Sequence, residues 1–316
     1  MSKISELHAA IRREVEKVVV GQDEALRLIL IALAAEGHVI LEGVPGLAKT
    51  TLVRALARAL NLQFKRIQFT PDLMPSDIVG TQVFNFQESK FHLVEGPVFT
   101  NLLLADEINR APAKAQSALL EAMQERQVSI EGATRTLPGP FLVLATQNPV
   151  EYEGTYPLPE AQLDRFLFKI TLDYPTLEEE QKVLDQHRGD TAGLSTLLDS
   201  IEPVADADAL NAAKEETLAV NVKPEVSRYL LELVRRTRDD VNIQLGGSPR
   251  ASLMLLVAAR AAASLEDRDY LIPDDVKALF APVLRHRILL TASAEVEGMG
   301  ADSVLRGILD AAPVPR

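Results

Sequence analysis

One segment constrains the fold of this 316-residue chain more than any other: the loop GVPGLAKT at Gly43–Thr50. It follows a short apolar strand predicted at His38–Glu42 and precedes a helix predicted at Thr51–Leu60 from its apolar periodicity. A loop in this position binds phosphate through backbone N–H groups and the helix dipole, with a lysine reaching the β- and γ-phosphates and a hydroxyl ligating Mg²⁺. We therefore predict that a cofactor is bound by Thr51, at the start of the helix, together with the phosphate-binding loop, which is made of Gly43, Val44, Pro45, Gly46, Leu47, Ala48, Lys49 and Thr50.

One residue of this loop departs from the general pattern. Ala48 stands where a second glycine is expected. Because this position is the entry to a helix, we expect a negative φ there, which a residue with a Cβ adopts without strain. On this motif alone, an ordinary turn between a strand and a helix remains the alternative.

The rest of the chain predicts two domains. Apolar strands at 64–69, 102–105, 141–145 and 166–172, with a helix at 113–125 among the connections, indicate a mostly parallel sheet covered by helices on both faces. Alternating patterns predict inserted hairpins at about 81–95 and 127–138. After Pro175 the chain turns helical, with helices predicted at 177–187, 205–216, 224–238, 250–265 and 273–284. We predict a nucleotide-binding core at 1–175 and a smaller all-helical domain at 176–316.

Polar residues at strand ends are further candidates for the site. Asp106 and Glu107 follow the apolar strand at 102–105, at the edge where open α/β sheets bind ligands; Asp106 could orient Mg²⁺ and Glu107 could polarise water. Asn148 follows the strand at 141–145 and could bond to a γ-phosphate or a water, although a turn-capping asparagine before proline is the more ordinary interpretation. Taken singly, Arg165 and Arg250 are indistinguishable from surface arginines.

Composition excludes several classes of function. The chain has no cysteine, which excludes disulfides, thiolate catalysis and Cys-ligated metals. Its net charge of −12 has the wrong sign for a surface that grips nucleic acid throughout, although a local basic patch remains possible. No signal pattern precedes residue 17, and the longest apolar run near the start, 28–35, is too short for a membrane span. We expect a soluble, cytoplasmic protein without membrane insertion.

Five motifs taken together resemble the MoxR family of AAA+ ATPases. They are the loop at 43–50, the stretch RIQFTPDLMPSDIVG at 66–80, LADEINRAP at 104–112, ATQNP at 145–149 and EAQLDRF at 160–166, in the order that the family has them. The resemblance covers about residues 19–250, and the family shares the alanine at position 48. It implies a P-loop AAA+ core with a five-stranded parallel sheet, followed by a smaller helical lid.

The resemblance also implies roles for individual residues. Lys49 and Thr50 resemble Walker A, Asp106 and Glu107 resemble Walker B with Glu107 as the catalytic base, and Asn148 resembles sensor 1. Arg165 is similar to an arginine finger, which enters the site of a neighbouring subunit, and Arg250 to sensor 2 on the lid. The segment that would pack on adenine is Val20, Gly21 and Gln22. The two hairpins resemble the helix-2 insert and the pre-sensor-1 hairpin, which project toward a pore or a partner.

The function implied by the family is hydrolysis of Mg²⁺-ATP in a ring, with a hexamer expected. Such a ring would remodel or mature protein clients, for example by inserting a cofactor or metal, together with a partner that carries a von Willebrand factor A domain. Two alternatives remain open: a nucleic-acid translocase, which the negative charge disfavours, and a nucleotide-gated scaffold with negligible turnover, which Glu107 and Arg165 disfavour.

Overall fold

The N-terminal part of the computed structural model is built on a parallel sheet. The structure describes residues 3–148, 155–186 and 194–315. The five strands are β1 (Val39–Glu42), β2 (Phe64–Gln68), β5 (Leu102–Asp106), β8 (Leu142–Gln147) and β9 (Phe168–Thr171), in the spatial order β2-β5-β8-β1-β9. All neighbouring strands are parallel, which confirms the predicted five-stranded sheet.

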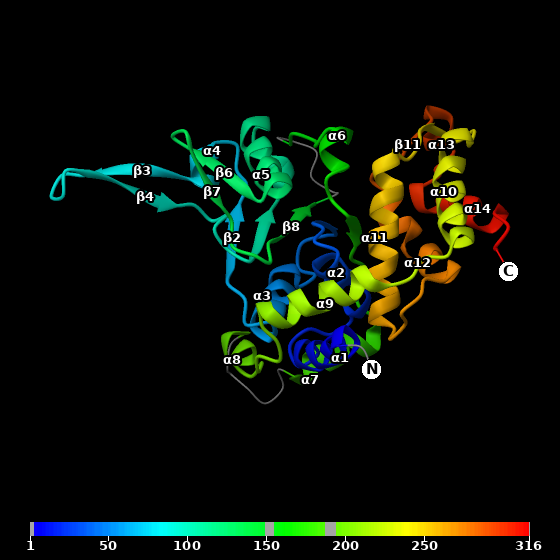
Figure 1. Ribbon diagram of the computed structural model, residues 1–316, viewed down its shortest axis with the longest axis horizontal. Coiled ribbons are helices and arrows are strands. Elements are labelled where there is room, and N and C mark those ends of the chain that lie inside the picture. Colours follow the sequence, from blue (N-terminus) through cyan, green and yellow to red (C-terminus); the bar gives the residue numbers. More distant parts are fainter. Residues whose placement is uncertain (1–2, 149–154, 187–193, 316) are drawn as a thin grey trace.

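Side chains of successive strand residues enter different cores, because they point to opposite faces of a sheet. In β5, Leu102 and Leu104 pack in one cluster, and Leu103 and Ala105 pack in another. The first cluster also contains residues of α1 (Lys3–Val15), α2 (Asp23–Ala34) and α3 (Lys49–Ala59); the second contains residues of α4 (Pro75–Val79) and α5 (Ala113–Glu125). Helices therefore cover both faces (Figure 1).

Two hairpins leave the connections of the sheet. Strands β3 (Gly80–Asn85) and β4 (Lys90–Glu95) pair antiparallel, as do β6 (Gln127–Ile130) and β7 (Ala133–Thr136). The β3–β4 hairpin projects far from the core at the left of Figure 1. It carries exposed aromatic rings: Phe84 packs edge-to-face on Phe86 and Phe91, and the Phe86 side chain is 86% exposed. This hairpin therefore presents apolar surface to solvent.

The C-terminal part is predominantly helical. It contains α10 (Pro224–Asp239), α11 (Pro249–Leu265), α12 (Pro273–Leu284), α13 (Ala292–Val296) and α14 (Ala301–Ala311), together with a small antiparallel pair of β10 (Ile243–Leu245) and β11 (Leu289–Leu290). We call this unit, α10–α14 with β10–β11, the lid. Its two short strands modify the prediction of an all-helical domain. They pair residues more than forty positions apart, which local sequence patterns do not reveal.

Four more α-helices are described, of which the first precedes β9 within the core and the other three lie between β9 and the lid. They are α6 (Glu160–Leu163), α7 (Leu177–Gln186), α8 (Leu194–Asp199) and α9 (Ala207–Ala219). Helix α9 contacts α1 and α2 of the core as well as α11 of the lid. The division at residue 175 stays a prediction, and residue 187, the predicted end of one helix, lies outside the described residues. No helix in the described part of the chain combines the length and apolar character needed to cross a bilayer.

His38, just before β1, is buried with both ring nitrogens engaged. Its Nδ1 accepts a hydrogen bond from the Val143 N–H at 3.0 Å, so Nε2 carries the proton and donates to the Met123 carbonyl at 3.1 Å. A second proton, on Nδ1, would place an N–H donor against the N–H of Val143 and break that hydrogen bond. Burial is the main cause that lowers the pKa of His38, to about 4, against an opposing effect of the bond to Met123. The ring is therefore neutral in the folded protein.

Unfolding should become easier as the pH falls from about 6.5 toward 4. In this range the unfolded chain protonates His38, whose ordinary pKa is 6.5, and the folded protein does not. The full stability is present above pH 6.5, and about 3 kcal/mol is lost by pH 4. The measurement is the urea unfolding midpoint of the wild type and of His38→Gln across this pH range. Because both proteins have the same carboxylates, the difference between their pH slopes isolates the contribution of His38. Equal pH slopes for the two proteins would contradict the assignment.

Candidate active site

A pocket of about 360 Å³ opens at the carboxyl ends of the parallel strands. The loop after β1 and the ends of β2, β5 and β8 surround it, which is the usual place for a ligand in an open α/β sheet. Its lining residues are Gly43, Pro45, Gly46, Leu47, Ala48, Lys49, Thr50, Thr51, Arg66, Gln68, Asp106, Glu107, Thr146, Gln147 and Asn148. The fold thus brings together residues from four of the five sequence motifs.

The loop ends at helix α3 with its first N–H groups available to a ligand. The first turn of an α-helix has N–H groups without intrahelical partners, and no described side chain caps this helix. Gly46, at φ +92°, has a conformation that favours glycine. The expectation for Ala48 is wrong: its φ is +55°, in the left-handed region. The residue is the N-cap, so it lies outside the helix and its φ follows the turn of the loop.

The ammonium group of Lys49 interacts with several carboxylates around the first pocket. It donates a hydrogen bond to the Gly43 carbonyl, so the side chain folds back across the loop. Burial lowers the pKa of Lys49, while the carboxylates of Asp106, Glu42 and Glu107 oppose that shift. A partly desolvated cation faced by carboxylates interacts strongly with any further charge that enters the pocket.

Asp106, at the end of β5, is fixed by two neighbouring strands. Arg66 Nε of β2 donates to Asp106 Oδ2 at 2.7 Å, and Thr146 Oγ1 of β8 donates to Oδ1 at 2.8 Å. The same threonine hydroxyl accepts a hydrogen bond from the Glu107 N–H at 2.9 Å. Thr146 therefore orients both acidic residues at once.

Glu107 has a strained backbone and an engaged side chain. Its φ of +55° is unusual for a residue with a Cβ and costs about 1 kcal/mol or more. Its Oε2 accepts a hydrogen bond from Gln68 Nε2 at 2.6 Å and lies 3.2 Å from Arg110 Nη1. Strained residues of this kind cluster at functional sites, because the surrounding structure holds them in place.

Sequence reasoning missed the residues that hold the two acids. On the strands that flank β5, Gln68 ends β2 opposite Asp106, Arg66 lies two residues earlier on β2, and Thr146 is the last residue but one of β8. The signal was available, because polar residues at the ends of adjacent parallel strands converge on one edge. From the sequence, Arg66 and Thr146 are identified only as members of the motifs at 66–80 and 145–149.

Several predicted residues lie outside this pocket. Gly21 and Gln22 line a second pocket of about 490 Å³ between the core and helices α12 and α14 of the lid, and Val20 lines a third pocket of about 620 Å³, which Gly21 also lines. Val44 packs against the larger hydrophobic cluster. The second pocket adjoins the phosphate-binding loop, because its lining residue Leu172 bonds through its N–H to the carbonyl of Glu42 at 2.8 Å.

The two predicted arginines also lie beyond the described lining of the first pocket. Arg165 occupies the turn between α6 and β9, and Arg250 lies in the first turn of α11. Burial is the main cause that lowers the pKa of Arg287, to about 10, against the opposing effect of Asp164, and the nearby charge of Arg250 adds to the lowering. Both arginines are therefore near the junction between core and lid. Pro149, the last residue of the fourth motif, lies outside the described residues.

The pocket fits a nucleotide polyphosphate with a magnesium ion. The uncapped start of α3 and Lys49 supply donors and positive charge for phosphate oxygens. The hydroxyl of Thr50 and the carboxylate of Asp106 both line the pocket and are hard oxygen donors, the type that Mg²⁺ prefers. Because Mg²⁺ is commonly held by one or two side chains together with substrate phosphates, this donor set is sufficient.

Comparison with known proteins agrees with the fold. Residues 38–168 match the sequence profile of the ATPase family associated with various cellular activities (AAA), and residues 235–308 match that of an AAA lid domain. The chain is 46% identical to the uncharacterized protein YeaC of Bacillus subtilis, over 100% of this chain and 98% of the relative. It is also 46% identical to the chaperone MoxR1 of Mycobacterium tuberculosis, over 96% and 81% of the two chains.

A solved structure supports the same assignment. A crystal structure of a Cytophaga hutchinsonii protein described as an ATPase superposes with a TM-score of 0.90 at 42% identity, covering 99% of this chain and 97% of the other. Core, lid and relatives together define the class as an AAA+ ATPase. Within that class, the chain belongs to the MoxR family.

Proposed function

We propose that this ATPase hydrolyses Mg²⁺-ATP as a subunit of a hexameric ring and uses the energy to remodel or mature protein clients. The observation that carries the proposal is the convergence in one pocket of an uncapped helix N-terminus, Lys49 and the acidic pair Asp106 and Glu107. This set can bind a polyphosphate, hold a metal ion and activate a water molecule.

Each residue of the pocket has a distinct task in this proposal. The loop from Gly43 to Thr51 binds the phosphates, and Thr50 and Asp106 hold Mg²⁺, which neutralises charge on the β- and γ-phosphates. Glu107 accepts a proton from the attacking water. Its carboxylate has lone pairs beyond the one that accepts the hydrogen bond from Gln68, so that bond can remain while water binds. Asn148 orients that water or the γ-phosphate.

Residues beyond the pocket complete the proposed site. Val20, Gly21 and Gln22 contact adenine in or beside the second pocket, which would close as the lid moves. Arg250 approaches the phosphates from the lid. Arg165 enters the site of the neighbouring subunit, so the interface is head-to-tail and closes into a ring.

The proposed client is a protein, with a von Willebrand factor A domain protein as the partner. Support comes from the similarity to the chaperone MoxR1 and from the exposed rings of Phe84, Phe86 and Phe91 on the projecting hairpin. An exposed apolar cluster on an extended element is typical of a surface that contacts other proteins. We propose a cytoplasmic location and no direct role for nucleic acid.

Phosphate release from ATP, measured with and without Mg²⁺, tests this function. We expect turnover that requires Mg²⁺ and that does not change when duplex or single-stranded DNA is added at low salt. A stimulation by DNA that fades as salt rises would instead favour a translocase, because phosphate contacts release counterions. ATP binding without phosphate release would identify a nucleotide-gated scaffold.

A further inference from the structure

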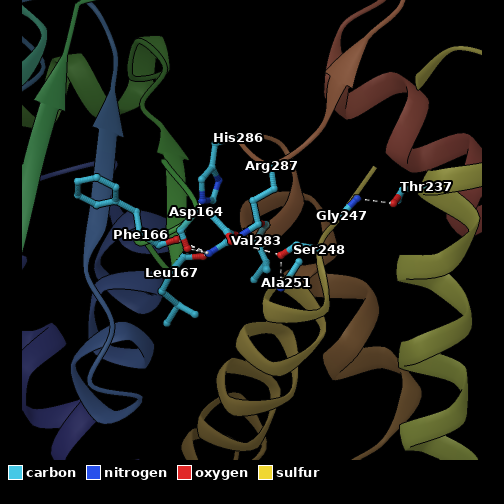
Figure 2. Close-up of polar contacts among 10 residues, drawn as sticks. All are labelled: Asp164, Phe166, Leu167, Thr237, Gly247, Ser248, Ala251, Val283, His286 and Arg287. Atoms are coloured by element: carbon cyan, nitrogen blue, oxygen red, sulfur yellow. Dashed lines mark hydrogen bonds and ion pairs between the residues drawn. The ribbon is translucent and has the colours of Figure 1, made fainter. Parts of the chain in front are cut away.

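A buried arginine of the lid holds the turn that carries Arg165 (Figure 2). Arg287 follows α12, and its side chain is 1% exposed. Its Nε donates to Asp164 Oδ1 at 2.7 Å. Its Nη atoms donate to the backbone carbonyls of Asp164 at 3.2 Å, of Leu167 at 3.1 Å, and of Phe166. One guanidinium group thus fixes the backbone on both sides of Arg165.

The same aspartate is tied to a second lid element. Ser248 Oγ donates to Asp164 Oδ2 at 3.2 Å and accepts a hydrogen bond from the Ala251 N–H at 3.3 Å. Ser248 is therefore the N-cap of α11, the helix whose first turn contains Arg250. The carboxylate of Asp164 joins the turn of Arg165 to the start of the helix of Arg250.

The turn that presents Ser248 cannot shift independently of the lid. The N–H of Gly247 donates to Thr237 Oγ1 of α10 at 2.9 Å, and Thr237 is fully buried (Figure 2). A Cβ on Gly246 would lie 2.6 Å from the Thr237 carbonyl oxygen, so this turn packs directly against the backbone of α10. A movement of α10 and α11 therefore carries Ser248 with it.

We propose that Asp164 is a positioning residue through which the lid of each subunit sets the place of the Arg165 that the subunit presents to its neighbour. The inference rests on the proposed function, in which Arg165 acts in trans. It adds a route by which the lid over one nucleotide affects hydrolysis at the next site. The route consists of two contacts to one carboxylate, from Arg287 and from Ser248.

Ser248 offers a sharper test than Asp164 or Arg287. Removing either partner of this ion pair, whose guanidinium is buried, leaves an unpaired charge and destabilises the fold. Asparagine and aspartate are both good N-caps, so either preserves the start of α11. Ser248→Asn keeps a donor for Asp164, whereas Ser248→Asp places a second carboxylate against it. Asparagine and aspartate have nearly the same shape, so the two variants differ mainly in the group that faces the Asp164 carboxylate.

The experiment uses mixed rings in which each chain has one task. Lys49→Ala chains cannot bind ATP and serve only as donors of Arg165, and Arg165→Ala chains bind ATP and serve only as acceptors. Ser248→Asp is placed in the donor chain. Misplacement of a catalytic group by about 1 Å can cost 10²-fold, so we expect turnover of the mixture to fall roughly 10- to 100-fold. The KM for ATP should stay unchanged, because the altered chain binds no nucleotide.

Two controls separate positioning from folding. The reference mixture contains Lys49→Ala donors and Arg165→Ala acceptors with no further change. Ser248→Asn in the donor should leave turnover within about twofold of this reference mixture. Thr291→Asp introduces the same carboxylate at another lid N-cap, on α13, and should have no effect. Thermal unfolding and native mass spectrometry should show that every donor folds and assembles.

The outcomes are distinct. If the reference mixture recovers activity and Ser248→Asp in the donor does not lower it, the positioning role of Asp164 is wrong while the proposed function stands. A donor that folds but no longer assembles would also overturn it, since the contact would then hold the ring together. If the reference mixture itself shows no recovery, the role of Arg165 in trans is wrong, and this inference falls with it.

Discussion

Arg165→Ala should bind ATP almost as the wild type does and hydrolyse it roughly 10³- to 10⁵-fold more slowly, the range that an arginine finger supplies in nucleotide hydrolases. The guanidinium group neutralises charge on the transferring phosphoryl group and contributes little to ground-state binding. Arg165 is outside the described lining of its own phosphate pocket, which agrees with a role at another subunit's site. Phosphate release and calorimetric ATP affinity measure the two effects separately.

The trans arrangement has a second consequence. Specific activity of the wild type should rise steeply with protein concentration as rings assemble. Mixing Arg165→Ala with Lys49→Ala should restore activity, because some interfaces then pair an intact loop with an intact arginine. A mixture that exchanges subunits and does no better than the sum of its parts would show that Arg165 is only a structural arginine. Arg228→Ala, at an exposed position of α10 outside the first pocket's lining, is a control that should retain activity.

The second prediction with a large expected effect uses two variants that separate ATP binding from ATP hydrolysis at the first pocket. Lys49→Ala should lose both ATP affinity and turnover, because it removes the positive charge that the β- and γ-phosphates would meet. Glu107→Gln should keep ATP affinity and lose turnover by at least 10²-fold, since it removes the general base and retains the shape. The Gln68 contact gives a reason to expect that the amide is accommodated.

Calorimetry with ATP and phosphate release for both variants check this assignment. Wild-type turnover in Glu107→Gln would exclude Glu107 as the base. Because Glu107→Gln should hold ATP without consuming it, the same variant is suited to trapping client and partner proteins for identification. Lys49→Ala, which should bind neither nucleotide nor client, is the matched negative control for that capture.

The sequence was sufficient for the fold and for the location of the first pocket. Gly43–Ala48 lies between β1 and α3, which begins at Lys49, two residues before its predicted start, and Asp106 and Glu107 lie at the end of β5 and directly after it. These features depend on short-range periodicity and on the rule that parallel strands end at one edge. The roles assigned to Asn148, Arg165 and Arg250 came from resemblance to the family, and they stay predictions until the variants are measured.

Other features depend on contacts between residues far apart in the chain. The left-handed conformation of Ala48 contradicts the local expectation, because the path of the loop, and not the following helix, sets its φ. Thr146 bonds to both Asp106 and Glu107 from a strand forty residues away. The convergence of parallel strands at one edge predicts that such polar residues lie near one another, but it does not predict which of them form hydrogen bonds.

What the sequence determined by itself was therefore the set of elements, their order and the chemistry at their ends, because hydrophobic period and loop composition act over a few residues. What only the tertiary structure decided was which polar groups meet. The ion pair of Arg287 with Asp164 spans 123 positions and forms only when the lid packs on β9. Burying that guanidinium is tolerable only where its partners are already in place, and this condition belongs to the folded chain as a whole.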